Sequence, residues 1–307
     1  RARVCAGIAA GTRPELEGSL VARAESGPGA EGEQPFSFLE GPVWMEREGV
    51  LRFSDFNRAS ALDADALGPP SIVWELGPGG VRAFLPEGVA RSNGLAIDEA
   101  GFLVAALHDR REIARLAPVD GARTRLVDRH EGGRFNAPND LVVGSGGVVF
   151  FTDPAYAGQL DGRARELAHE GVYRLDPAGT LTLVDDSLGR PNGITLSPDE
   201  RWLYVATRAD AGLYRYRLDD AGHAGQRELF LPGESNDGVA IDCAGNLYLA
   251  RPGRGLAIVT PDGHELRQLS ARRITNAAFG GPDHRTLFLT EQTRLRSVRV
   301  SVPGLPY

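Results

Sequence analysis

The chain has little of what several large classes of protein need. It has two cysteines, Cys5 and Cys243, and they form no CxxC motif. Nothing in their spacing indicates a disulfide framework or a zinc site. Because Cys243 lies inside an apolar strand pattern, we expect it to be a small buried hydrophobic residue.

The sequence also lacks long apolar runs and a basic excess. No apolar run approaches the roughly 18 residues that a membrane helix needs. The 307 residues carry a formal net charge of −7, whereas a nucleic-acid surface requires a basic face. We therefore expect no nucleic acid and no membrane as partners, while the oligomeric state stays open.

The expected cellular compartment depends on whether the sequence contains a signal peptide. The apolar stretch from Cys5 to Ala10 is too short and too weak for a signal peptide, so we expect a cytoplasmic protein. The chain begins without Met, which leaves a removed leader and a periplasmic location as the alternative.

Common catalytic signatures are missing as well. There is no GxSxG nucleophile elbow, no Walker loop and no GxGxxG. The six histidines show no HxH or HExxH spacing. His108 is the one histidine that we single out, because it ends a strand pattern and precedes Asp109-Arg110-Arg111.

What the sequence does contain is a repeat. A polar residue, usually followed by Gly or another small residue, opens an alternating strand, and a turn and a second strand follow. The six lead residues recur at intervals of 39 to 53 residues: Glu40, Asn93, Asn139, Asn192, Asp237 and Asn276. One Asn-Gly pair alone usually marks a hairpin turn. Six in the same phase, each ahead of a strand, instead indicate a repeated unit.

β-rich repeats of 40 to 50 residues are typical of propellers, in which each four-stranded unit is a blade. The sequence therefore predicts an all-β, six-bladed β-propeller as a single domain over residues 1–307, with roughly the first 18 residues as a possible extension. We expect Ser19–Ala24 to complete the last blade beside Leu295–Ser301. The one helix that we expect lies at Arg163–His169, in an insertion within the third blade.

The lead residues have a chemistry in common. In a propeller the first strand of every blade lines the central channel, so these residues should converge at one mouth. They supply two carboxylates and four amides, which suit a hard divalent cation such as Ca²⁺ or Mg²⁺. Zn²⁺ would normally recruit His or Cys. The alternative is that these side chains only hydrogen-bond the backbone at the blade ends.

At this point the motifs resemble a known family. Glu40-Gly41-Pro42-Val43-Trp44, Arg134-Phe135-Asn136-Ala137-Pro138-Asn139-Asp140-Leu141, Pro191-Asn192-Gly193 and Asn236-Asp237-Gly238 look like the gluconolactonase family, which includes senescence-marker protein (regucalcin). The resemblance covers roughly residues 20–300, with the motifs in the right order. One departure is Asn236, where Pro is frequent in the family.

The resemblance implies a hydrolase of a sugar (aldono)lactone, most simply a gluconolactonase, with one catalytic divalent cation in the channel. Calcium is the expected ion, with Mg²⁺, Zn²⁺ and Mn²⁺ as alternatives. Carried over by motif, the metal ligands fall on Glu40, Asn139, Asn192 and Asp237, and Asp237 is also the candidate general base. The expected substrate contacts are Arg134, Asn136, Asn93, His108 and Tyr156, with Trp44 as a further candidate.

Two other functions stay open on the sequence alone. A phosphoryl oxygen could take the place of the lactone carbonyl oxygen, which would make the protein a phosphotriesterase-like hydrolase of the fluorophosphatase type. A propeller could also bind a ligand without catalysis. The mixed set of carboxylates and amides argues against the second alternative, since a binding propeller needs no ion site.

Overall fold

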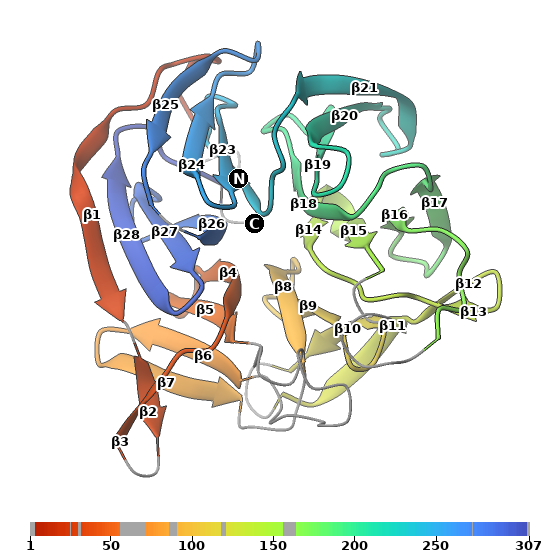
Figure 1. Cartoon of the computed structure of the whole chain (residues 1–307), viewed down its shortest axis with the longest axis horizontal. Coiled ribbons are helices and arrows are strands. Elements are labelled where there is room, and N and C mark those ends of the chain that lie inside the picture. The colour runs from red at the N-terminus through yellow and green to blue at the C-terminus, as the bar shows by residue number, and fades with distance from the viewer. Residues whose placement is uncertain are drawn as a thin grey trace.

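A computed structural model describes residues 4–24, 26–29, 32–55, 72–85, 91–117, 121–155, 164–271 and 273–305. Within these residues, six four-stranded antiparallel sheets surround a central axis (Figure 1). The only helical element described is a 3₁₀ turn at Ser145–Gly147, and no described helix is long and apolar enough to cross a membrane. The prediction of an all-β, six-bladed propeller is confirmed.

The first three blades follow one another along the chain, each running from the inside of the ring outward. Blade 1 comprises β4 (Leu39–Met45), β5 (Val50–Asp55), β6 (Ile72–Gly77) and β7 (Gly80–Leu85). Blade 2 comprises β8 (Ser92–Ile97), β9 (Leu103–Leu107), β10 (Glu112–Leu116) and β11 (Arg123–Val127). Blade 3 comprises β14 (Leu141–Val143), β15 (Val149–Asp153), β16 (Gly171–Leu175) and β17 (Leu181–Asp185).

The next blades repeat this order, and two small hairpins decorate the ring. Blade 4 comprises β18 (Pro191–Leu196), β19 (Trp202–Thr207), β20 (Gly212–Leu218) and β21 (Ala224–Pro232). Blade 5 comprises β22 (Val239–Ile241), β23 (Leu247–Arg251), β24 (Gly255–Val259) and β25 (Glu265–Leu269). The hairpins pair β2 (Ser26–Gly29) with β3 (Gly32–Pro35), and β12 (Arg129–His130) with β13 (Gly133–Arg134).

The ring closes by joining the two ends of the chain. Blade 6 contains β26 (Ile274–Gly280), β27 (Thr286–Glu291) and β28 (Arg294–Val300), and its outer strand is β1 (Leu16–Ala24) from the N-terminal part. Leu16 lies opposite Val300, and Val21 lies opposite Ser297. The predicted completion of the last blade by the N-terminal segment is confirmed.

The core lies between neighbouring blades rather than at one centre. The inner strands β4, β5, β9 and β18 are buried along their whole length, because both of their faces pack on adjoining sheets. Between blades 1 and 2, for example, Val43 and Met45 pack in one cluster with Leu95 and Leu103. The outer strand β11 is mostly exposed. The arrangement fixes the inner strand of every blade firmly along the channel.

The predicted helix at Arg163–His169 is wrong in its described part, residues 164–169, which form bends and extended chain. Two contacts explain the difference. Glu166 accepts hydrogen bonds from Arg111 and from the backbone N–H of Arg134, and Leu167 is buried in the cluster of blades 2 and 3. The segment is therefore fixed to its neighbours through side chains that a helix would have to present elsewhere.

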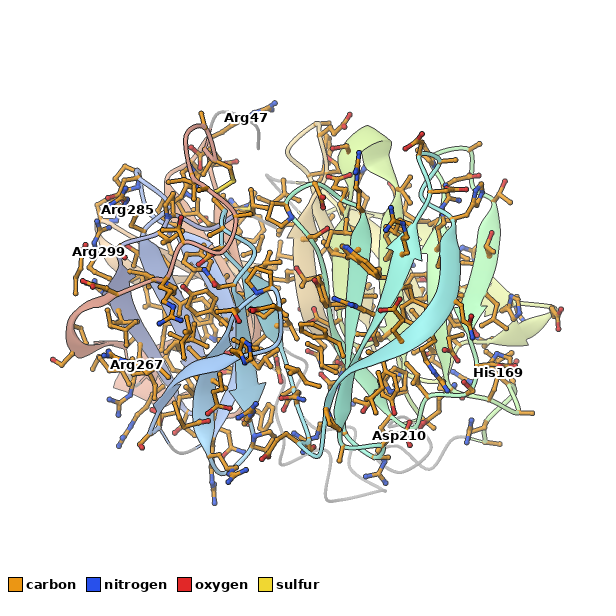
Figure 2. The ribbon with its side chains drawn as sticks, turned by 90° about the horizontal axis from the view of Figure 1, so that it is seen from above. Arg47, His169, Asp210, Arg267, Arg285 and Arg299 are labelled. Atoms are coloured by element: carbon orange, nitrogen blue, oxygen red, sulfur yellow. A yellow bond between two sulfur atoms is a disulfide. The ribbon has the colours of Figure 1, made fainter. Side chains whose placement is uncertain are left out.

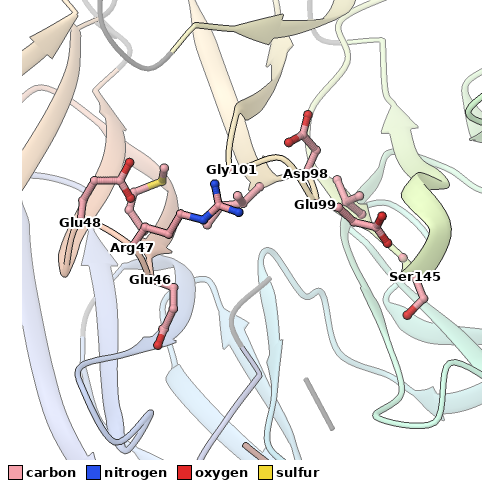
Figure 3. Close-up of a pocket in the computed structure, with 11 residues that line it drawn as sticks. Glu46, Arg47, Glu48, Asp98, Glu99, Gly101 and Ser145 are labelled. Atoms are coloured by element: carbon pink, nitrogen blue, oxygen red, sulfur yellow. The ribbon is translucent and has the colours of Figure 1, made fainter. Parts of the chain in front are cut away.

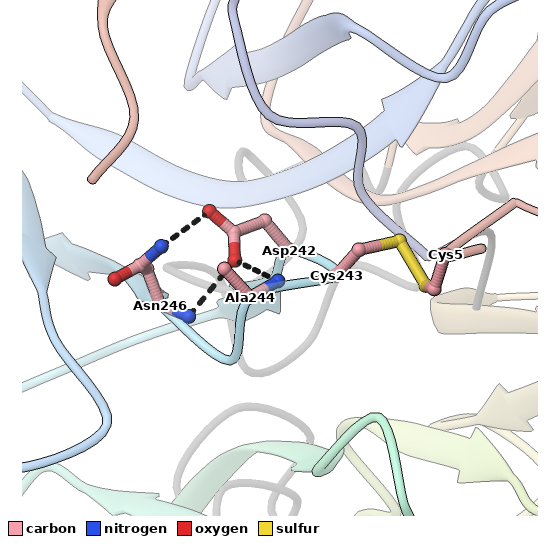
Figure 4. The surroundings of a disulfide bond; sticks show 5 residues. All are labelled: Cys5, Asp242, Cys243, Ala244 and Asn246. Carbon is pink, nitrogen blue, oxygen red and sulfur yellow. Dashed lines mark hydrogen bonds between the residues drawn. A yellow bond between two sulfur atoms is a disulfide. The ribbon is translucent and has the colours of Figure 1, made fainter. Parts of the chain in front are cut away.

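The two cysteines form a disulfide (Figure 4), so the expectation of no disulfide is wrong, whereas Cys243 is buried as expected, at 6% exposure. The bond joins the N-terminal segment to the turn between β22 and β23, across a sequence separation of 238 residues. Spacing over such a distance carries no information about contact, so this disulfide cannot be predicted from the sequence. The backbone N–H of Gly11 also donates to Ala244 at 2.8 Å, which holds the same segment in place.

The disulfide lies at one end of the channel, where the chain ends also pack. Asp242 organises the turn by accepting hydrogen bonds at 2.9 Å from the backbone N–H groups of Ala244 and Asn246. Cys243 packs in a cluster with Leu305, and Leu305 also lines a small cavity of about 30 Å³ between the first strands of the blades.

Because the disulfide closes a very long loop, its loss should destabilise the fold by about 2–4 kcal/mol. We expect Cys5→Ser, or wild type in dithiothreitol, to melt at least about 4 °C below the oxidised wild type by calorimetry. Dithiothreitol should leave the melting temperature of Cys5→Ser unchanged. Equal melting temperatures for oxidised and reduced wild type would contradict a stabilising role.

Candidate metal and catalytic site

The six lead residues stand where the first strand of each blade begins, at the channel end opposite the disulfide. They belong to, or directly precede, β4, β8, β14, β18, β22 and β26. Figure 2 separates the two ends: Arg47, from a turn after a first strand, lies at one, and Asp210, from a loop after a second strand, lies at the other. The site is at the end of Asp210.

Glycines after the lead residues let the blades approach each other. A Cβ atom on Gly41 would lie 2.0 Å from the carbonyl oxygen of Asn93, and one on Gly193 would lie 2.3 Å from that of Asp237. A Cβ on Gly238 would lie 2.1 Å from the side chain of Asn276. The repeated Gly is therefore a steric requirement for contact between neighbouring blades.

Hydrogen bonds at this level link every pair of neighbouring blades into a closed ring. The six donor and acceptor pairs are Ser54–Ser92 (2.8 Å), Gly94–Asn139 (2.7 Å), Thr152–Asn192 (2.7 Å), Gly193–Asp237 (3.1 Å), Gly238–Thr275 (2.8 Å) and Thr275–Leu39 (2.7 Å). Most use the carbonyl oxygen of a residue in or beside the next blade's first strand. The ring holds the backbones of the lead residues at fixed positions, which leaves their side chains directed at the mouth.

Three carboxylates meet there. Burial, and then the negative charges of Asp237 and Asp140, raise the pKa of Glu40 well above its usual value. Burial likewise raises the pKa of Asp140 to about 7 and that of Asp237 to about 6. Burial, and for Glu40 also the neighbouring negative charges, thus disfavour the ionised forms of these carboxylates. A cation bound among them would offset that cost.

Amides accompany the carboxylates. A hydrogen bond from Asn192 lowers the pKa of Asp237, and the Asn276 amide donates to Asp140 at 3.3 Å. Asn139 is 5% exposed, and its side-chain amide makes no hydrogen bond within the described residues. The structure therefore brings Glu40, Asn192 and Asp237 together at the mouth, while the role of these residues and of Asn139 as metal ligands stays a prediction.

The sequence did not reveal Asp140 as a third carboxylate of the mouth. It directly follows the lead residue Asn139, at the place where other repeats have Gly. In blade 3 this exception puts a carboxylate oxygen within 2.6 Å of where a Cβ on Gly94 would stand. The signal was present as a break in the Asn-Gly pattern, but the lead position alone was compared between repeats.

Arg208 was also missed. Its Nη1 donates to Asp237 Oδ2 at 2.9 Å. Arg208 directly follows β19, and the residues that end or follow the second strands of blades 1, 2 and 3 are Asp55, His108 and Asp153. In blades 5 and 6 the same position holds Arg251 and Glu291, so the repeat pattern does not distinguish Arg208, whose role depends on its contact with Asp237.

His108 contacts the mouth through Asn93, whose Nδ2 lies 3.4 Å from His108 Nε2. Burial, and then the charge of Arg91, lower the pKa of His108 to about 4. At neutral pH the imidazole is therefore uncharged. It can donate or accept a hydrogen bond but adds no positive charge to the site.

The predicted substrate contacts Arg134 and Asn136 lie beside the mouth, at the end of β13 and in the segment that follows it. The Asn136 amide donates to Asp153 Oδ2 at 3.1 Å and to the His169 carbonyl at 2.9 Å, and its Oδ1 accepts from Arg165 at 3.2 Å. Arg134 donates to the Arg110 carbonyl, and its Nε is buried without a partner in the described part of the chain. Their role as substrate contacts stays a prediction, with Asn136 saturated by protein groups.

The two other candidate substrate contacts are Tyr156 and Trp44. Tyr156 lies outside the described residues. Trp44 is 9% exposed, and its ring stacks on Phe288 with centroids 5.9 Å apart, so it belongs to the core of blades 1 and 6.

A larger cavity, of about 510 Å³, opens at the opposite end of the propeller (Figure 3). It lies between turns of blades 1, 2 and 3 and is lined by Glu46, Arg47, Asp98, Glu99 and Ser145, among others. Arg47 bridges it by donating to the Ala100 carbonyl at 3.0 Å. None of the predicted site residues lines this cavity, so size alone does not identify the functional end.

The donor set decides what the mouth could hold. Among the described residues, no three or more His, Cys, Asp or Glu side chains form a metal-binding cluster by themselves. An ion here would depend on amide oxygens together with the carboxylates. Oxygen donors of these two kinds fit Ca²⁺ or Mg²⁺, and the buried, mutually repelling carboxylates fit a divalent charge.

Comparisons with known proteins agree with this arrangement. Residues 38–293 match the profile of the family described as SMP-30/gluconolactonase/LRE-like region. A gluconolactonase of Zymomonas mobilis is 36% identical over 86% of this chain and 79% of its own. The structure of a gluconolactonase from Xanthomonas campestris superposes with a TM-score of 0.78 at 28% identity, covering 96% of this chain and 97% of that one.

A more distant structure shares the fold. It is a protein from Agrobacterium tumefaciens described as calcium-binding regucalcin, with a TM-score of 0.70 at 20% identity over 92% of this chain and 94% of that one.

The glycine requirement can be tested at one position. Gly238→Ala should destabilise the protein by about 1–3 kcal/mol, because its Cβ would overlap the Asn276 side chain. Gly79→Ala is the matched control, since a Cβ there meets nothing within 4 Å. Urea denaturation of both variants gives the difference. Equal stability for the two variants would contradict the close approach of blades 5 and 6.

Proposed function

Because the chain belongs to the SMP-30/gluconolactonase/LRE-like family, we propose that it is a metal-dependent lactonase whose substrate is glucono-1,5-lactone. At the level of a sugar-lactone hydrolase, the prediction made from the sequence is confirmed by the family and by the gluconolactonase relatives. The proposal of a metal-dependent gluconolactonase rests on one observation. Glu40, Asp140 and Asp237 lie together at the mouth with two amides and Arg208.

We propose Ca²⁺ as the ion, held by Glu40, Asn139, Asn192 and Asp237. The support is the all-oxygen donor set, the raised pKa values of the carboxylates, and a distant structure described as calcium-binding. When bound, such an ion would polarise the lactone carbonyl and lower the pKa of a water molecule.

The chain's own groups then handle water, proton and sugar. Asp237 Oδ is the acceptor for the proton of the attacking water, whose oxygen adds to the carbonyl carbon to form a tetrahedral adduct. The adduct then loses its ring C–O bond, the ring oxygen takes the proton back from Asp237, and the product is a hydroxy acid. Burial raises the pKa of Asp237 to about 6 although the charge of Arg208 lowers it, so Asp237 is still a weak base and acts best on a water molecule whose pKa is already lowered. We expect neutral His108 and Asn93, which lie 3.4 Å apart between Nε2 and Nδ2, to hydrogen-bond sugar hydroxyls.

The disulfide also bears on the compartment. Disulfides persist in oxidising environments and are rare in the cytosol of mesophiles. The Cys5–Cys243 bond therefore supports the periplasmic alternative over the cytoplasmic expectation, and we propose an oxidising compartment. Fractionation of the native host combined with thiol labelling tests this. Recovery of the protein in the cytosol with two free thiols would overturn it.

The activity prediction concerns Asp237. Wild type should hydrolyse glucono-1,5-lactone, lose the activity in EDTA and regain it with calcium. Asp237→Asn should lower kcat at least about 100-fold, because the amide no longer accepts the proton, while retaining part of the metal binding. A pH-stat assay measures turnover, and calorimetry measures calcium binding.

The same assay separates the alternatives. Hydrolysis of a fluorophosphate in preference to the lactone would favour the phosphotriesterase. Inactivity on both substrates, with no metal in the purified protein, would favour a binding propeller. Full lactonase activity in Asp237→Asn would sink the role given to Asp237.

A further inference from the structure

Arg208 occupies a fixed position between blades 4 and 5. Its backbone N–H donates to the Arg190 carbonyl at 3.0 Å, and its own carbonyl accepts from Ser235 Oγ at 3.2 Å. The neighbouring Thr207 carbonyl accepts from the N–H of Asn236 at 3.1 Å. The loop that carries Asp237 is thereby bound to the end of β19, so the Arg208 side chain starts from a rigid base.

One edge of the Arg208 guanidinium is hydrogen-bonded to Asp237, and the other edge is open to a further acceptor. Nη1 is committed to Asp237, whereas Nε and Nη2 make no hydrogen bond within the described residues. The Arg208 side chain is 31% exposed and that of Asp237 only 13%, so the arginine covers the carboxylate on its solvent side. Because the guanidinium is planar and carries five N–H donors, it can hold Asp237 and a second oxygen at once.

The charges at the mouth indicate a role for Nε and Nη2, the open edge of the Arg208 guanidinium. Glu40, Asp140 and Asp237 bring three negative charges when ionised. A divalent ion would compensate two of them and leave one. Arg208 supplies the remaining positive charge, without which the site would repel any oxygen that gains negative charge during ester cleavage.

Other described arginines near this end are engaged elsewhere. Arg111 donates to the Phe135 carbonyl and to Glu166. Arg134 donates to the Arg110 carbonyl, and Arg254 pairs with Glu234. Among the described residues, Arg208 is the arginine that forms an ion pair with the carboxylates of the mouth.

We propose that Arg208 is a catalytic residue that donates hydrogen bonds from its open edge to the lactone carbonyl oxygen as that oxygen gains negative charge. The proposal rests on the proposed lactonase function. Donors aimed at developing charge act mainly in the transition state, so they change kcat more than KM. After the ring opens, the same edge faces the carboxylate of the product.

The test removes the guanidinium and supplies it again. Arg208→Ala should lower kcat on glucono-1,5-lactone about 100-fold while KM stays within about threefold. Millimolar methylguanidinium should restore at least about tenfold of the lost rate, and Arg208→Lys should lie between the two. Calorimetry should show calcium binding to Arg208→Ala as tight as in wild type or tighter, since a positive charge has gone.

The control is Arg190→Ala, which removes the exposed side chain of the residue before β18 and keeps the backbone carbonyl that accepts from Arg208; within the described residues, the Arg190 side chain forms no ion pair with Glu40, Asp140 or Asp237. It should keep kcat within about twofold and show no response to methylguanidinium. The proposal is overturned if Arg208→Ala keeps kcat within threefold of wild type, loses calcium binding, or is not rescued. An inactive wild type would instead reject the lactonase function itself, and this inference with it.

Discussion

Close contact between neighbouring blades at one level of the channel is the constraint on which the rest of the structure depends. Six hydrogen-bonded steps pass from blade to blade around the ring, and Gly41, Gly94, Gly193 and Gly238 stand where a Cβ atom would overlap the next blade. The inner strands are thereby brought close enough for the side chains that open them to share one mouth. Blade 6 completes the circuit with a strand from the other end of the chain.

The close contact between neighbouring blades also sets the electrostatic environment of the mouth. Without that contact, the carboxylates of blades 1, 3 and 5 would be solvated, whereas the closed ring buries Glu40, Asp140 and Asp237 beside one another. Burial raises all three pKa values, and neighbouring negative charge raises those of Glu40 and Asp140 further, so the metal-free fold holds an electrostatic cost at this end. A divalent cation and the guanidinium of Arg208 offset that cost, so stability and function converge on the same few residues.

How far the sequence predicts this molecule depends on whether the signal repeats. The fold, the closing strand and the converging lead residues could be predicted because the same phase occurs six times. Asp140 could not be found from the lead position, since a carboxylate directly after the lead residue occurs in blade 3 only. Arg208 has a counterpart in Arg251 of blade 5, so its role follows from its contact with Asp237 in space and not from its position in the repeat. The disulfide joins residues 238 apart, and the bent segment after residue 163 is held by tertiary contacts of Glu166 and Leu167; neither leaves a local pattern.

The central claim is that the mouth of the ring binds one divalent cation. A crystal structure of the protein soaked in Mn²⁺, with anomalous diffraction data, tests it most directly, because manganese scatters anomalously and accepts the same oxygen donors as calcium. The account predicts one strong anomalous peak in contact with Glu40, Asn192 and Asp237. A mouth without a peak at saturating manganese, with the carboxylates hydrogen-bonded only to protein and water, would contradict it.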